Sequence, residues 1–581
     1  MKSKTSFFNM TALKKDVTRY APIWVFYTIY LLLMLFSMMS SIPAYAAETV
    51  VETMPSMLWI NLLYAGICAA FLCMDLFHSR LCNGLHAFPV HRESWLTTHI
   101  VSGMLFSFVP NLLTSLLACL LMGEFYYIAF LWLAVSTLQF IFFFGTAILA
   151  AMCAGNLLGM IAVYGITHLI TVLVYYVTVL FYEPLLHGVY FNEEYFFRFF
   201  PLGQMGEFDY IEYRTHRVEE EIRGEFMGFL PEQWRYLGIC AVFGVVALVL
   251  AFLVYRRRHL ETAGDLIAWR PLAPVFLTVF AIGSGMILFL FFALFGDVSS
   301  FLLIIGISIG YFTGRMLLNR TLKVFTKKVF LGLGVMIAVL AGTLLLTLLD
   351  PLGVTRYVPE LDKIANVRVI GADKDSYYSS YSPFSSFYWD EVTSPGFAIT
   401  DQTEITKAQD FHKELIQYRP AADSDILCDV RIVYTLKNGR TVLRNYRVEH
   451  DSKLGKQAGA YFSDVRYVFE VSDPEMLYWA FESVSVDAYY DEKNVSVKLT
   501  DTQDIAGLID AVKADCEAGL MAQNWAYHDK YEENYYVHFS ANAEILDNTE
   551  WGTGRKYLRI WPDCTNTTAY LRQMIDKYPQ E

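Results

Sequence analysis

Four histidines lie close together along the first part of the chain, and histidine is a common metal ligand. They are separated by eight, five and eight residues, at His78, His86, His91 and His99. These spacings match no compact ligand motif, and none of the nine cysteines forms a C-x-x-C pair that would complete a zinc site. The pattern therefore predicts no metal centre.

The chain carries no motif for nucleotide binding, and its C-terminal domain carries none for nucleophilic catalysis. The fragment nearest to G-x-x-x-x-G-K-[ST] is Gly455-Lys456-Gln457, which lacks the preceding glycine and the hydroxyl residue that would ligate magnesium. No G-x-S-x-G accompanies the later histidines His412, His450, His528 and His538. We expect this chain neither to hydrolyse ATP nor to be an enzyme, and we expect no cofactor and no nucleic-acid partner.

Ionisable side chains within apolar stretches would indicate a proton- or sodium-coupled carrier, because each costs about 2.5–3.5 kcal/mol at bilayer depth. The main strongly polar residues in these stretches are Asn61, Asn111 and His168. His168 has two interpretations, a proton site or a histidine hydrogen-bonded between packed helices. A transporter of this composition needs an energy source on another polypeptide, and a cytoplasmic ATPase is the simplest one.

The elements that position these residues are mostly membrane-spanning helices. The chain has 581 residues, 55% of them hydrophobic, and its mean hydropathy of +0.35 is too high for a soluble protein of this length. Apolar stretches of spanning length predict about nine helices, at residues 23–42, 57–74, 100–122, 126–152, 157–182, 236–255, 274–295, 299–318 and 330–349. We expect an all-α polytopic transmembrane bundle at residues 1–349 and a separate domain at residues 350–581.

The distribution of charge predicts the orientation. Outside a long loop at residues 183–235, the sixteen lysines and arginines before residue 350 all fall on one side of the nine-span topology. The other side receives the long loop, with 11 acidic and 5 basic residues, and residues 350–581, with 38 acidic and 24 basic residues. We expect a multi-pass cell-membrane protein with a cytoplasmic N-terminus, an extracellular C-terminal domain, and membrane lipid as a partner of the basic side. Ala44-Tyr45-Ala46-Ala47 also fits a signal-peptide cleavage site, and cleavage there would not change the orientation of the other spans.

Two cytoplasmic loops, at residues 75–99 and 256–273, carry recognisable motifs. The sequence DLFHSRLCNGLHAFPVHRESW at residues 75–95 resembles the His-Ser…Leu-Pro-x-x-Arg-Glu loop of ABC-2-type permeases, the membrane subunits of ABC exporters in Firmicutes. The sequence YRRRHLETAG at residues 255–264 is similar to their Tyr-x-x-Arg-x-x-Glu-x-Ala-Gly segment, with Arg258, Glu261 and Gly264 at the motif positions. Two residues depart from the pattern: His91 replaces a second basic residue, and Phe88 replaces leucine.

In that family the first loop forms a short coupling helix that docks in a groove of the ATPase. The resemblance implies this role for Leu85, His86, Phe88, Pro89, Arg92, Glu93 and Trp95. These residue types suit a docking helix, because proline favours the first helical position, glutamate favours the N-terminal end, and the apolar side chains can fill a groove. The alternative is that Arg80 and Arg92 only anchor the loop to anionic lipid.

Residues 350–581 predict an extracellular α+β domain. Alternating strands at residues 429–436 and 441–448 flank Asn438-Gly439, the strongest hairpin signal in the chain. We expect further strands at residues 367–370, 461–471, 484–490, 495–499, 535–539 and 557–560, and helices at residues 406–418, 502–520 and 567–578. The hairpin and the segment AQDFHKEL at residues 408–415 look like an uncharacterised C-terminal domain of some Firmicutes permeases. The tyrosine-rich stretch at residues 377–388 has two interpretations, a site for sugar or peptide and a mobile loop.

The sequence therefore predicts the membrane-spanning permease subunit of an ATP-driven ABC exporter. Its partners would be a cytoplasmic ABC ATPase subunit and a second permease copy or a related permease. The alternative is a membrane-anchored sensor or resistance protein whose acidic exterior domain binds a cationic ligand such as an antimicrobial peptide. A sensor needs a cytoplasmic output domain, and none of the inner loops is long enough to hold one. A membrane enzyme would show paired carboxylates or a nucleophile at an interface, and the sequence has no convincing set.

Overall fold

The computed structural model divides the chain into two compact units. The helical unit comprises Met1–Val177 and Glu193–Gly342, and the α+β unit comprises Thr178–Asn192 and Thr343–Glu581. The residues described are 8–39, 43–86, 91–191, 196, 199–207, 210–218, 221–294, 301–372, 398–420, 427–449, 452–469, 471, 474–490, 493–521, 534–541 and 555–578.

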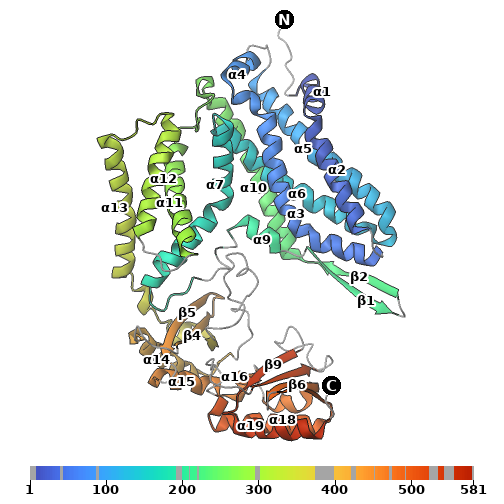
Figure 1. Cartoon of the computed structure of the whole chain (residues 1–581), viewed down its shortest axis with the longest axis vertical. Helices are drawn as coiled ribbons and strands as arrows, with labels where there is room; N and C mark the ends of the chain where they lie inside the picture. The colour runs from blue at the N-terminus through green and yellow to red at the C-terminus, as the bar shows by residue number, and fades with distance from the viewer. Residues whose placement is uncertain are drawn as a thin grey trace. The chain divides into compact units, whose positions relative to one another are not determined.

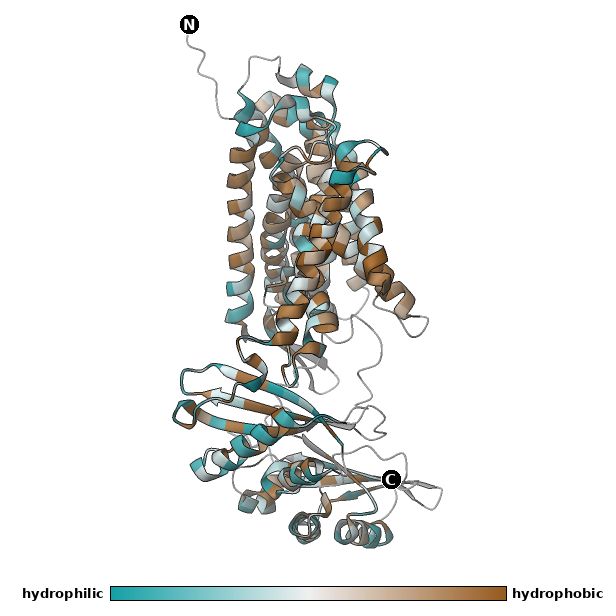
Figure 2. Ribbon diagram, turned by 90° about the vertical axis from the view of Figure 1, so that its left-hand side faces the viewer, coloured by the Kyte–Doolittle hydropathy of each residue, from teal (hydrophilic) through white to brown (hydrophobic). Residues whose placement is uncertain are grey.

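Long apolar helices form the helical unit (Figures 1 and 2). Within the described residues, eight helices are long and apolar enough to cross a membrane: α2 (Ala21–Met38), α5 (Arg92–Met122), α6 (Tyr126–Cys153), α7 (Leu157–Val177), α10 (Pro231–Arg257), α11 (Leu272–Ala293), α12 (Phe301–Asn319) and α13 (Lys327–Leu349). A further helix, α3 (Pro43–Leu72), is bent by 55° between Tyr45–Met54 and Ser56–Leu72, and it makes a ninth span if its two parts count as one. This confirms the expected helical bundle, although α3 begins well before residue 57.

The central helix of the unit is α6, which packs against α3, α5, α7 and α10. Small residues let its backbone approach that of α10, because a Cβ atom on Gly145 would lie only 2.2 Å from the carbonyl oxygen of Gly244. A second close pair is α11 and α12, where a Cβ atom on Gly306 would lie 2.7 Å from the Cα atom of Gly285. The apolar side chains that remain exposed on the outer faces suit a lipid environment (Figure 2).

Shorter elements complete the helical unit. The helices α1 (Met10–Arg19) and α4 (Ser79–His86) lie at the same end of it (Figure 1). The first is amphipathic, and its start is capped by the side chain of Asn9, which accepts hydrogen bonds from the backbone amides of Thr11 and Ala12. The expected loop at residues 183–235 contributes α9 (Pro201–Glu207) and an antiparallel hairpin of β1 (Ile211–Val218) and β2 (Glu221–Phe229).

The α+β unit contains two antiparallel sheets, which confirms the expected mixture of helices and strands. The first sheet has the order β3-β4-β5, from β3 (Ile364–Ala372), β4 (Leu427–Leu436) and β5 (Thr441–Glu449). Its core includes side chains of α14 (Gln402–Gln417) and α15 (Lys453–Phe462). The predicted hairpin is present, and Gly439 takes the positive φ of 80° that its turn requires.

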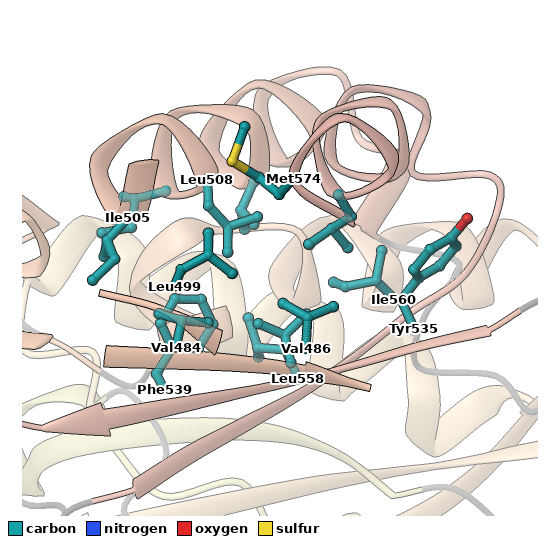
Figure 3. Close-up of a cluster of buried hydrophobic side chains, with 14 of the residues drawn as sticks. Val484, Val486, Leu499, Ile505, Leu508, Tyr535, Phe539, Leu558, Ile560 and Met574 are labelled. Atoms are coloured by element: carbon teal, nitrogen blue, oxygen red, sulfur yellow. The ribbon is translucent and has the colours of Figure 1, made fainter. Parts of the chain in front are cut away.

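The second sheet has the order β7-β6-β8-β9, from β6 (Phe481–Tyr490), β7 (Lys493–Leu499), β8 (Asn534–Ala541) and β9 (Arg555–Ile560). Figure 3 shows its buried face, where Val484, Val486 and Phe539 meet Leu508 of α18 (Thr502–Glu517) and Met574 of α19 (Thr565–Lys577). The four strands and two helices expected here are all present.

One predicted strand, at residues 461–471, is wrong. The segment instead contains the end of α15 and the short helix α16 (Val465–Phe469). The cause lies upstream, because the Ser452 hydroxyl accepts a hydrogen bond from the Gly455 amide and so starts α15. Leu454, Ala458 and Phe462 then fall on one buried helical face.

The α+β unit also includes a segment from the loop after α7. Val189 pairs with Arg444 of β5 in an isolated antiparallel bridge, and the Asn445 amide donates a hydrogen bond to the carbonyl oxygen of Gly188 at 3.1 Å. Gly188 has a φ of 75°, and a Cβ atom there would lie 2.2 Å from the Tyr446 ring. The segment Thr178–Asn192 therefore completes the edge of the first sheet.

Candidate functional site

Arg258 joins the ends of several helices in the helical unit. It follows the last residue of α10, and only 7% of it is exposed. Its Nη1 donates to the carbonyl oxygens of Ala151 (2.9 Å) and Met152 (3.3 Å), and its Nη2 donates to that of Leu76 (3.1 Å). Burial lowers the pKa of Arg258, but a guanidinium stays charged at neutral pH. Its charge is balanced by the negative end of α6, where the last carbonyl groups lack partners within the helix.

The two sequence motifs meet at this point. Arg92 Nη1 donates to the Arg258 carbonyl oxygen at 3.4 Å. Glu93, which follows Arg92 in the chain, accepts a hydrogen bond at Oε1 from Arg256 Nε at 2.6 Å. Glu93 lies in the first turn of α5, where the helix dipole also favours a carboxylate. Residues far apart in the sequence thus tie the start of α5 to the end of α10.

Gly264 connects the same loop to the turn between α6 and α7. Its amide donates to the Gly155 carbonyl oxygen at 2.6 Å, and its own carbonyl oxygen accepts from Asn156 Nδ2 at 3.0 Å. Its φ is 94°, and a Cβ atom would lie 2.9 Å from Arg320 Nη2, so glycine suits both the backbone and the space. Glu261, the remaining motif residue, is exposed in a 3₁₀ turn (Leu260–Thr262). We call this whole set of contacts the junction.

The expected coupling helix differs in position from the short helix that is present. The short helix is α4, at Ser79–His86, whereas Arg92, Glu93 and Trp95 belong to the first two turns of the long helix α5. Phe88 and Pro89 lie outside the described residues, as do the side chains of Leu85 and His86. Their role in coupling stays a prediction.

Trp95 is only partly available for contact with a partner. The residue is half-buried, its ring centroid lies 6.3 Å from that of His99, and its buried Nε1 has no hydrogen-bond partner among the described residues. Among the described side chains of α4, Leu81 is the large apolar one that is exposed, at 46%. Leu81 was not among the expected coupling residues, and its place on an amphipathic helix next to the motif is the signal that could have found it.

Sequence reasoning also missed a buried polar cluster beneath α1. Asp16 Oδ2 lies 2.8 Å from His99 Nδ1 and accepts a hydrogen bond from Ser102 Oγ at 2.9 Å. All three residues are buried. The serine donates to the carboxylate and not to the imidazole, so this is not the arrangement of a nucleophile activated by a base. It fixes α1 against α5.

The amide side chains and His168 inside the bundle are hydrogen-bonded. Asn61 Nδ2 donates to Gln139 Oε1 at 2.8 Å, and Asn111 Oδ1 accepts from Trp132 Nε1 at 3.2 Å. His168 Nε2 lies 3.0 Å from Thr146 Oγ1, which confirms the interpretation as a histidine hydrogen-bonded between packed helices. In the described part of the chain, no three His, Cys, Asp or Glu side chains are placed to hold a metal ion.

Comparison of the chain with protein-family models, with curated proteins and with solved structures gave no match. The proposed function therefore rests on the residues of the junction.

Proposed function

We propose that this chain is the membrane-spanning permease subunit of an ATP-driven ABC exporter, energised by a separate cytoplasmic ATPase. The observation that supports the proposal is the contact between the two motifs, through Arg92 with Arg258 and Glu93 with Arg256. The motif resemblance and the distribution of basic residues support a cytoplasmic junction, with the acidic α+β unit outside the cell.

The junction suits the transmission of a movement from a docked partner. A force on α4 reaches Leu76 through the short connecting segment, and Arg258 links Leu76 to the end of α6. Arg258 directly follows the last residue of α10, and Arg92 is the first residue of α5, so both helices are connected to these contacts through the backbone. Four spanning helices, α3, α5, α6 and α10, thus share one set of contacts at a single end, so that they move together.

The interior of the bundle agrees with an external energy source. The hydrogen-bonded polar side chains at its centre are neutral amides, an indole, a hydroxyl and His168. The buried carboxylate of Asp16 lies on α1, which is not one of the spanning helices, and it is bonded to His99 and Ser102. A coupled carrier would need a carboxylate or another titrating group on its ion path. Energy would therefore reach these helices from the junction.

The docking surface on the partner would receive α4. Leu81 is an exposed apolar side chain of this helix, and Arg80 beside it is exposed as well. Placing a charge at a docked apolar contact leaves that charge without water, and an unpaired buried charge costs several kcal/mol. Leu81→Glu should therefore abolish docking.

The test is co-purification of the tagged chain, from cells that express it naturally, with a protein that carries a Walker A motif. The matched control is Leu322→Glu, because Leu322 is 77% exposed in the turn between α12 and α13 and lies outside the motifs. We expect Leu81→Glu to lose the ATPase and Leu322→Glu to retain it. Retention of the ATPase by both variants would remove α4 as the docking element, and no association with the unchanged chain would contradict the permease function.

A further inference from the structure

A groove beside the junction is lined by unusually many cationic side chains. It has a volume of about 620 Å³, which is in the range of ligand-sized sites, and it lies where α10 ends and α11 begins. Its polar lining is formed by Arg257, Arg258, His259, Glu261, Thr262, Asp265 and Arg270.

Two of its three arginines have no partner within the described residues. Arg258 is bonded to carbonyl oxygens, whereas Arg257 and Arg270 are exposed and form no ion pair there. Of the two acidic residues, Asp265 is paired with Arg320 at 3.0 Å, which leaves Glu261. The free charges in the groove are therefore two cations and one anion, so that the groove favours an anionic ligand.

The apolar surroundings resemble a membrane interface. Trp269 lines the groove and is 45% exposed, and tryptophan is enriched where spanning helices meet the headgroup layer. Beyond the groove, Leu253 on α10 is 49% exposed and Val275 on α11 is 48% exposed. A ligand with an anionic head and apolar chains matches a cationic groove that is followed by exposed apolar side chains.

We propose that the groove binds an anionic phospholipid through its phosphodiester group. Arg257 and Arg270 hold the phosphate, Trp269 lies at the glycerol level, and the acyl chains follow the exposed faces of α10 and α11. Glu261 weakens the site by repulsion. This inference goes beyond the proposed transport function and does not depend on an ATPase.

The experiment measures binding of dioctanoyl phosphatidylglycerol to the full-length protein in a neutral detergent, with dioctanoyl phosphatidylcholine and inorganic phosphate as the other two ligands. An arginine near an anionic lipid contributes about fivefold in affinity, so Arg257→Gln with Arg270→Gln should weaken binding roughly 30-fold. Arg80→Gln, which removes one exposed arginine of α4 at the same end of the unit, is the control, and it is compared with the single variants Arg257→Gln and Arg270→Gln. Glu261→Gln should strengthen binding.

Each outcome decides the proposal. The proposal is supported if lipid binding is weakened by the arginine double variant and not by Arg80→Gln, if Glu261→Gln strengthens it, and if phosphatidylcholine binds poorly. An equal effect of Arg80→Gln would reduce the groove to general surface charge and overturn the proposal. Displacement of the lipid by millimolar phosphate would overturn it in favour of a site for free anions. If the double variant does not fold, the opposite shift expected for Glu261→Gln still decides the matter.

Discussion

The stability of the α+β unit should depend on pH through His412. This histidine is fully buried between two tyrosines, with Nδ1 3.0 Å from the Tyr434 hydroxyl and Nε2 2.8 Å from the Tyr446 hydroxyl. Burial, with a smaller contribution from Arg444, lowers the pKa of His412 from 6.5 to about 3. The folded state therefore holds the neutral imidazole, whereas the unfolded chain binds a proton below its ordinary pKa.

The sign and size of the effect follow from proton linkage. Because the folded-state pKa is depressed, the stabilisation is fully present above pH 6.5 and is lost as the pH falls toward 3. Between pH 8 and pH 5 the unfolded state gains about 2 kcal/mol from protonation of one histidine. That figure changes little for any folded-state pKa below about 4, so it does not depend on the size of the shift.

The assay is urea unfolding of a fragment of residues 350–581 at a series of pH values between 8 and 5. The fragment leaves out the edge segment Thr178–Asn192, which contributes no residue to the hydrophobic core around His412. The fragment begins at Asp350 because this carboxylate accepts hydrogen bonds from Val354 and Thr355 at the start of the unit. We expect the free energy of unfolding to fall by about 2 kcal/mol over this range, and His412→Gln to remove most of that slope. His538→Gln, which replaces a histidine of β8 whose side chain is 43% exposed, is the matched control and keeps it. An unchanged slope in His412→Gln would refute the reasoning.

Two further predictions concern the segment after α7 and the topology. Gly188→Ala should undock the segment at a cost of about 1–3 kcal/mol, because alanine suits neither the positive φ nor the space beside Tyr446. Hydrogen exchange at the Asn445 amide should then accelerate. The control is Gly165→Ala, which has nothing within 4 Å of its Cβ position and should leave that exchange unchanged. For the topology, an impermeant thiol reagent should label Lys437→Cys in sealed cells and should label Arg80→Cys only after permeabilisation. The reverse pattern would overturn the orientation.

The sequence was most informative where one physical demand dominates a whole segment. Lipid requires long apolar helices, and each predicted span coincides with a helix, although α3 begins earlier because residues 43–56 form a bent extension. The hairpin at Asn438-Gly439 was equally clear, since few residues accept its turn. The segment at residues 461–471 was ambiguous, because a short run rich in aromatic and β-branched residues suits a strand or a helix, and the cap at Ser452 decides it.

Contacts between distant segments could not be predicted from the sequence. The motifs indicated that Arg92 and Arg258 share one end of the bundle, but not that Arg92 bonds the backbone of Arg258, or that Arg258 caps α6. The pairing of Asp16 with His99 joins α1 to α5 through two residues with no local signature. Tertiary packing alone specifies such contacts. The tyrosine-rich stretch at residues 377–388 lies outside the described residues, so both of its interpretations stay open.

The central claim is that the junction transmits the action of an ATPase to the spanning helices, and the pair Glu93–Arg256 offers its most direct test. The two side chains are 27% and 58% exposed, so loss of the pair should cost at most about 1 kcal/mol of stability and leave the fold intact. The measurement is the ATP hydrolysis rate of the reconstituted complex containing the unchanged chain, Glu93→Arg, Arg256→Glu or the double exchange. We predict that each single change, which brings like charges together, lowers the stimulated rate, and that the double exchange restores it. Equal rates in all four complexes, or a rate that does not depend on the presence of this chain, would contradict the account.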